Sequence, residues 1–184
     1  MPTPKILDQV PLTFSQLMID TQRLGRNVMV NVGNWQQQLN INKQAFFNGW
    51  MQRPDFLARY PLSMSPAAFV DALNANTGNA ISASERDILV GLLSPNSNVG
   101  RALVMRQVTE NAEFSRRQFN RAFVLMQYFG YLRRNPDEAP EAGLNFDGFN
   151  FWLTKLEQHN GNFIQAEMVK AFIDSNEYRG RFGP

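Results

Sequence analysis

The sequence predicts an all-α protein, and three observations support that class. Apolar residues recur at steps of three and four through several segments, which is the spacing of one face of a helix. Helix-capping residues stand before these segments, and proline or glycine follows them. No stretch of convincing length alternates apolar and polar residues in the manner of a half-buried strand.

The composition is that of a globular chain without special stabilising chemistry. Its 184 residues, 43% of them hydrophobic, are enough to bury one substantial core or two small ones, and one compact domain is the simpler expectation. The absence of cysteine excludes disulfides, thiolate catalysis and cysteine metal sites. There is no run of about 18 apolar residues, so we expect no transmembrane helix. The first residues also lack the apolar core of a signal peptide.

The charge pattern disfavours nucleic acid as a partner. The net charge is +2 and the pI is about 9.1. Most of the basic residues are arginines that occur as scattered pairs, whereas a nucleic-acid interface needs a continuous stripe of cations.

The first segment, residues 1–33, is predicted to be an irregular arm with one helical turn over 14–19. Its apolar side chains should cover the aromatic face of residues 35–56, or the same face of a second molecule. A long helical pattern follows the arm, with residues 40–42 as a candidate break, and it ends at Tyr60, because Pro61 disfavours helical geometry in the residue before it.

Capping residues mark the helices in the middle of the chain. Ser65 followed by proline is a typical helix start. Ser84 is expected to cap a helix over 85–93, and Glu85 would then lie in the favourable first turn. A further helix is predicted over 101–114.

The segment Asn120–Asp137 is predicted to form the central helix, with Asn120 as its cap. It is apolar nearly all round, so it should pack on more than one side. Arg133 and Arg134 are expected to complement the helix C-terminus, and Pro136 prevents continuation. Asp137 is expected to accept amide hydrogen bonds where the chain reverses.

Two more helices are predicted after the central one, over 146–158 and 163–178, with a turn between them. Ile164 is expected on the inward stripe of the last helix. Large aromatic residues are expected mainly in the core, and these are Trp35, Trp50, Phe123, Phe149 and Trp152.

Internal similarity organises the helices into repeat units. The segments 45–60, 102–119 and 168–182 resemble one another, each with an acidic residue before an aromatic one. We therefore predict the arm and a single helical domain of about two and a half repeat units, with these bounds: arm 1–33, domain 34–184, half unit 34–61, unit 65–119 and unit 120–182.

Short motifs in the last repeat unit carry a family resemblance. They are an Arg-x-Pro-Asp turn, a Gly-x-x-x-Trp helix and a closing Ser-x-Glu-Tyr, at Arg134, Pro136, Asp137, Gly148, Trp152, Ser175, Glu177 and Tyr178. Residues 120–182 thereby resemble the bacterial repeat catalogued as domain of unknown function 4214, and 66–119 resemble it more loosely. The resemblance implies a helical module distantly similar to phycobilisome linker domains. Such modules are mostly found in secreted or cell-surface proteins and have no established enzymatic activity.

Candidate catalytic chemistry is sparse. His159 is the only histidine, which excludes catalytic triads and multi-histidine metal sites, and its position suits a helix C-terminal cation. Four carboxylates cluster in the loop 137–147, and they are Asp137, Glu138, Glu141 and Asp147. A glycosidase uses two carboxylates, but a solvated structural loop is the simpler interpretation. The cluster lacks the spacing of an EF-hand calcium loop.

The sequence therefore predicts a non-enzymatic helical scaffold or protein-interaction module of a secreted or surface-associated bacterial protein. Its partner would be another protein, its own parent chain or a second copy, and no cofactor or metal is expected. Arg133, Arg134, Pro136 and Asp137 are predicted to form a structural turn. An export signal is expected upstream in the full-length gene. The alternative is a carboxylate-dependent glycosidase that acts on polysaccharide through the loop 137–147.

Overall fold

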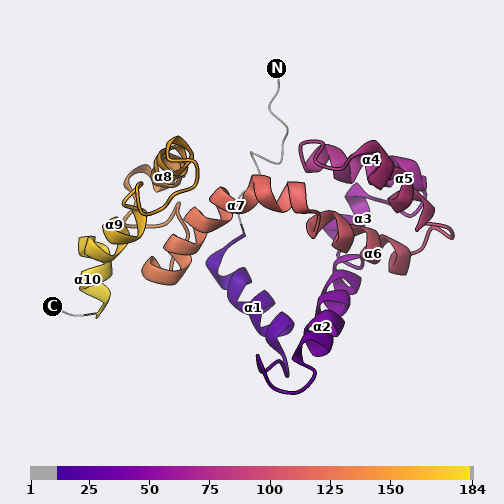
Figure 1. The fold of residues 1–184 in the computed structure, drawn as a ribbon, viewed down its shortest axis with the longest axis horizontal. Helices are drawn as coiled ribbons and strands as arrows, with labels where there is room; N and C mark the ends of the chain where they lie inside the picture. Colours follow the sequence, from indigo (N-terminus) through magenta and orange to yellow (C-terminus); the bar gives the residue numbers. More distant parts are fainter. Residues whose placement is uncertain (1–11, 183–184) are drawn as a thin grey trace. The chain divides into compact units, whose positions relative to one another are not determined.

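The computed structural model describes residues 12–182, and its regular elements are all helical (Figure 1). The predicted all-α class is confirmed. The elements in order are α1 (Phe14–Gly25), α2 (Trp35–Trp50), α3 (Pro54–Arg59), α4 (Pro66–Asn76), α5 (Ala83–Gly91), α6 (Asn98–Thr109), α7 (Ala112–Gln127), the π-helical turn η1 (Tyr128–Leu132), the 3₁₀ turn η2 (Ala142–Leu144), α8 (Asp147–Gln158), α9 (Met168–Asp174) and α10 (Asn176–Phe182).

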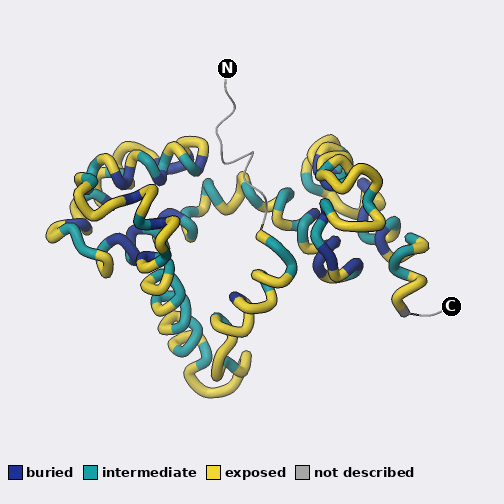
Figure 2. Tube along the Cα trace, turned by 180° about the vertical axis from the view of Figure 1, so that it is seen from behind, coloured by how far each residue is buried: buried dark blue, intermediate teal, exposed yellow. Residues whose placement is uncertain are grey.

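The described residues form two compact lobes where one domain was predicted. The first lobe comprises residues 17–116, and the second comprises residues 12–16 together with 117–182. The division after Arg116 lies close to the predicted repeat boundary at residues 119 and 120. Buried positions occur in both lobes, so each has a core of its own (Figure 2).

The first lobe is built on the packing of α2 along α6, with α4 against α5 and α6. The helical pattern predicted to run to Tyr60 is interrupted after α2, and the short helix α3 begins at Pro54. Proline lacks an amide proton and is favoured in the first turn of a helix, so it starts a new helix here. Arg53, the residue before it, is extended, as a residue before proline prefers.

The helix caps of this lobe are partly as predicted. The Ser65 hydroxyl accepts the amide hydrogen bond of Ala68 at the start of α4, which confirms the predicted start. Helix α5 is capped by Ser82 and not by Ser84. The Ser82 hydroxyl accepts from the Glu85 amide and the Glu85 carboxylate accepts from the Ser82 amide, which is a capping box. Hydrogen bonds from the Ser82 hydroxyl and amide hold the pKa of Glu85 below its ordinary value.

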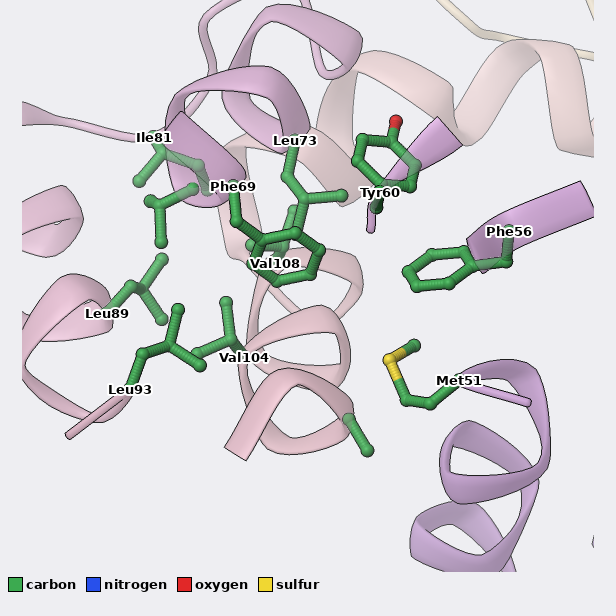
Figure 3. Close-up of a cluster of buried hydrophobic side chains, with 12 residues drawn as sticks. Met51, Phe56, Tyr60, Phe69, Leu73, Ile81, Leu89, Leu93, Val104 and Val108 are labelled. Atoms are coloured by element: carbon green, nitrogen blue, oxygen red, sulfur yellow. The ribbon is translucent and has the colours of Figure 1, made fainter. Parts of the chain in front are cut away.

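The core of the first lobe gathers side chains from α3 to α6 and from the end of α2 (Figure 3). Its aromatic centre is formed by Phe56, Tyr60 and Phe69, whose ring centroids lie 4.9–6.4 Å apart. The aromatic residues of α2 were predicted to be core, but no residue of α2 is fully buried. Phe47 and Trp50 pack only against the edge of the cluster.

Arg101 of α6 is the largest fully buried side chain of the described residues. Its Nη1 donates to the carbonyls of Tyr60 (2.8 Å) and Pro61 (3.0 Å), and its Nη2 donates to the carbonyl of Met64 (2.8 Å). Its Nε donates to the side-chain oxygen of Asn96 (2.9 Å). One guanidinium thus supplies hydrogen-bond donors to three backbone carbonyls of the turn that joins α3 to α4.

No carboxylate pairs with Arg101 among the described residues. The guanidinium instead lies over the Phe69 ring, 4.5 Å from its centroid. Burial lowers the pKa of Arg101, because its charge has been removed from water. The turn and the buried arginine therefore stabilise each other, together with Asn96, whose side-chain nitrogen donates to the carbonyls of Leu62 and Met64.

The second lobe is organised by α7 and the π-helical turn η1 that follows it. The Asn111 side chain accepts the amide hydrogen bond of Phe114, so α7 begins at Ala112. The prediction that Asn120 caps the central helix is wrong, because Asn120 lies inside α7. After η1 the chain turns at Arg133, whose left-handed φ of 50° ends the helix.

The last predicted helix is also divided. Residues 163–167 form turns, α9 begins at Met168, and Ser175 separates α9 from α10. Helices α9 and α10 pack against each other and against η1. Ile164 was predicted to face inward, but it is 74% exposed.

Among the described residues, the predicted irregular arm contains the helix α1, and most of its large apolar side chains are exposed and do not cover the face of residues 35–56 of the same molecule. The alternative, that they cover this face in a second molecule, stays a prediction. Phe14 belongs to the second lobe, where its amide donates to the Asn135 side chain (2.7 Å) and its ring lies 5.8 Å from that of Phe129. The later apolar residues of the arm are exposed, and these are Met18, Met29, Val30 and Val32. Residues 1–11 of the predicted arm lie outside the described part of the chain.

The Arg101 network generates a stability prediction. Replacing Arg101 with methionine keeps the bulk but removes the hydrogen bonds that the guanidinium donates to three carbonyls of the turn after α3 and to Asn96. A buried acceptor without a donor costs about 1–3 kcal/mol, and the Tyr60 carbonyl and the Asn96 oxygen lose the donor that Arg101 supplies, so we expect the free energy of unfolding in urea to fall by about 2 kcal/mol or more. Arg86 is the control, because it pairs with Asp71 at the surface (2.6 Å), and Arg86→Gln should cost less than about 1 kcal/mol. An Arg101→Met variant as stable as the control would contradict this role.

Candidate functional site

The predicted turn and repeat-signature residues of the second lobe meet around the guanidinium of Arg134. Its Nε and Nη2 donate to the two carboxylate oxygens of Glu177 (2.8 and 3.0 Å). Nη2 also lies 3.5 Å from a carboxylate oxygen of Glu141. This fork-to-carboxylate geometry is the strong form of an ion pair. It joins the turn after η1 to α10.

Arg134 also folds its own turn. Its Nη1 donates to the carbonyls of Asn135 (2.9 Å), Pro136 (3.1 Å) and Glu138 (3.0 Å). Burial disfavours the charged guanidinium, but Glu177 and Glu141 more than offset this, so the pKa of Arg134 is raised. The prediction that Arg134 is a cation at the helix terminus is therefore wrong, because its side chain turns inward.

Gly148 leaves space for the side chains that surround Arg134. Its amide donates to a Glu141 carboxylate oxygen (3.1 Å) near the start of α8. A Cβ atom at this position would lie 2.5 Å from that oxygen and 2.8 Å from the Tyr128 hydroxyl, so a larger residue does not fit. Tyr128 lies under the Arg134 guanidinium, 5.3 Å from it, and burial, followed by the charge of Glu141, raises the pKa of Tyr128.

The closing motif positions the partner of Arg134. The Ser175 hydroxyl accepts the amide hydrogen bond of Tyr178 (3.1 Å) and donates to the carbonyl of Phe172 (2.7 Å). It thereby ends α9 and starts α10, which carries Glu177. Trp152 of α8 is half-buried and contacts the Phe172 ring at 5.6 Å. The Tyr178 ring packs edge-on against Tyr131 at 5.8 Å.

The turn uses a different carboxylate from the predicted one. Glu138 accepts hydrogen bonds from the amide (2.9 Å) and from the side-chain nitrogen (2.7 Å) of Asn135. No hydrogen bond to the Asp137 side chain occurs among the described residues. Pro136 is fully buried, whereas Arg133 is exposed. Sequence reasoning placed the turn correctly but assigned its acceptor to the neighbouring residue.

The acids of the loop 137–147 are largely engaged in the fold. Glu141 binds Arg134 and Gly148, and Asp147 accepts a hydrogen bond from the Asn145 side chain (2.9 Å). His159 is the C-cap of α8. Across residues 12–182, no group of three or more His, Asp or Glu side chains is arranged to hold a metal ion. Each helix of this range is too short or too polar to cross a lipid bilayer.

Three phenylalanine rings stack in a row and form an exposed apolar surface of the second lobe. The Phe119 and Phe123 rings stack with centroids 6.3 Å apart, and the Phe123 and Phe163 rings stack at 5.2 Å. Phe119 is 62% exposed and Phe163 is 41% exposed. Met126, which is also exposed, continues the same face of α7. We refer to Phe119, Phe123 and Phe163 as the phenylalanine ladder.

The sequence contained part of this signal. Phe119, Phe123 and Met126 are spaced four and three residues apart, which places them on one helix face. Because the helix was predicted to begin at Asn120, Phe119 was left outside it. Phe163 was assigned to a helix that does not form at that position, so its stacking on Phe123 was not foreseen.

Comparisons of the chain with protein-family models, with curated proteins and with solved structures found no significant match. The resemblance of residues 120–182 to the bacterial repeat family therefore stays a prediction.

The turn after η1 generates a paired prediction. Glu138→Ala removes two hydrogen bonds from the turn, so the free energy of unfolding should fall by about 1 kcal/mol, as for loss of a helix cap. Asp137→Ala removes none and should change it by less than about 0.5 kcal/mol. Chemical denaturation of both variants measures the difference. Equal costs, or a larger cost for Asp137→Ala, would show that the turn depends on another acceptor.

Proposed function

We propose that this chain is a non-enzymatic helical interaction module whose second lobe docks a protein partner on the phenylalanine ladder. The observation that carries the proposal is the exposure of stacked aromatic rings at the surface of a folded lobe. Exposed apolar patches are typical of protein interaction sites, and aromatic residues dominate the energetics of such interfaces.

The chemistry of the signature residues supports a binding role over catalysis. The buried Arg134 pairs with the half-buried Glu141 and Glu177, so these charges serve the fold. A catalytic carboxylate pair would have to face a substrate. The glycosidase alternative has weaker support, because Glu138, Glu141 and Asp147 already accept hydrogen bonds within the lobe.

The family resemblance completes the proposal. Through it we assign the chain to a secreted or surface-associated bacterial protein, in which the partner is another protein, a further part of the same chain or a second copy. In this setting the two lobes act as scaffolds that present binding surfaces.

A peptide-selection experiment tests the docking surface. Peptides selected from a random library on the full chain should carry aromatic or aliphatic anchors and should bind with a measurable Kd. Replacing Phe119 and Phe163 with serine removes both exposed ends of the ladder. Loss of two interface aromatics should raise the Kd of the selected peptides by at least about 30-fold, since one hot-spot residue contributes about 2 kcal/mol or more to binding.

Phe151 provides the matched control, because it is 59% exposed but lies outside the ladder. Phe151→Ser should leave peptide affinity within about twofold. Equal weakening by the control would mean that the peptides respond to general hydrophobicity. Release of reducing sugar from a polysaccharide, lost in a Glu141→Gln variant that remains folded, would favour the glycosidase.

A further inference from the structure

The first lobe contains a cavity of about 540 Å³ whose charged side chains are all arginines. It is lined by residues at the end of α1 and just after it, by residues of α2, and by Arg53, the N-cap of α3. Its lining residues are Arg23, Arg26, Asn42, Ala45, Phe46, Gly49 and Arg53. The lining contains three cations and no acid.

Hydrogen bonds tie the backbone at the end of α1 to α2. The Asn42 side-chain nitrogen donates to the carbonyls of Leu24 and Arg26, both at 2.8 Å. The Asn42 oxygen in turn accepts from the Gln38 side chain (2.9 Å). This clamp fixes the end of α1 and therefore the backbone that carries Arg23 and Arg26.

The third arginine, Arg53, is held by a contact with an aromatic ring. Arg53 stacks over the Trp50 indole, 4.2 Å from the ring centroid. A cation–π contact uses the flat face of the guanidinium and leaves its N–H edges available for another ligand. Arg53 is also the N-cap of α3, so its backbone position is set by Pro54.

The arginines have few partners of their own. Arg26 makes no side-chain hydrogen bond or ion pair with any other described residue. Arg23 has one carboxylate nearby, Asp20, at 3.7 Å. Three guanidinium charges opposed by one carboxylate leave a local charge of about +2, which an anion would neutralise.

We propose that this cavity binds a small organic phosphate monoester. Arginine forks match the oxygens of a tetrahedral oxyanion, and a phosphate monoester carries about −1.5 to −2 charges at neutral pH. The volume is within the range of small-molecule sites and exceeds what an oxyanion alone needs. Phe46 and Ala45 supply an apolar floor for the organic part of the ligand.

Gly49 leaves the floor of the cavity open. A Cβ atom at this position would meet no atom within 4 Å. Glycine is therefore not required here for packing within this chain, and a larger side chain can be introduced without a clash. A large side chain introduced at position 49 should therefore fill the cavity.

Titration calorimetry of the full chain with phenyl phosphate at low salt tests the proposal. We expect saturable binding at one site. Phenyl sulfate carries a single charge and should bind about tenfold more weakly, and inorganic phosphate, which lacks the ring, should also bind more weakly. Higher salt should weaken binding, because the attraction is electrostatic. No saturable binding of phenyl phosphate would overturn the proposal.

Three variants separate the site from general charge effects. Arg26→Gln removes a cation that has no partner among the described residues. It should weaken the binding of phenyl phosphate by about tenfold, the effect of losing one charged hydrogen bond. Gly49→Phe should fill the cavity and abolish binding while the helix content stays unchanged. Arg59 is the control, because it is exposed, lies in the same lobe and does not line this cavity. Arg59→Gln should change affinity by less than about twofold.

Three results would contradict binding at this cavity. Equal weakening by Arg59→Gln and Arg26→Gln would show that the net charge alone attracts the anion. Undiminished binding to Gly49→Phe would place the ligand elsewhere. Equal affinity for phenyl phosphate and for inorganic phosphate would show that the apolar floor plays no part.

Discussion

Each lobe of this chain depends on one buried arginine whose guanidinium donates hydrogen bonds to the carbonyls of a turn. Arg101 satisfies the turn after α3 with neutral acceptors only, and Arg134 satisfies its own turn while it pairs with Glu177 and Glu141. Burying a guanidinium is costly unless its donors are all used, and burying a turn is costly unless its carbonyls find donors. Placing the two together offsets both costs.

This constraint explains why the residues that look most like a site are structural. Gly148 leaves room for the Glu141 carboxylate and the Tyr128 hydroxyl, which a Cβ atom would displace, and Ser175 starts the helix that brings Glu177 to Arg134. Because these groups stabilise the fold, binding of other molecules is expected at surfaces away from Arg101 and Arg134. The phenylalanine ladder of the second lobe and the arginine-lined cavity of the first lobe are such surfaces, one apolar and one cationic.

The features that the sequence predicts well are local ones. The helical class, the Ser65 cap and the turn near Pro136 follow from spacing, capping and the geometry of proline. The partner of Arg134 lies 43 residues away, so no local pattern could assign it. The start of α7 was misplaced because Asn111 and Asn120 are equally good caps by type, and in the structure Asn111 caps the helix. The exposure of Ile164 and the division into two lobes likewise depend on long-range contacts.

The most direct test of the arginine-centred account is a double-mutant cycle on Arg134 and Glu177. Free energies of unfolding are measured for Arg134→Met, Glu177→Gln and the double variant. If this pair holds the second lobe together, each single variant leaves the other group without its two-hydrogen-bond partner, and the double variant should cost less than the sum of the two single variants by about 2 kcal/mol or more. Additive costs, with a coupling energy near zero, would contradict the claim that this ion pair holds the second lobe together.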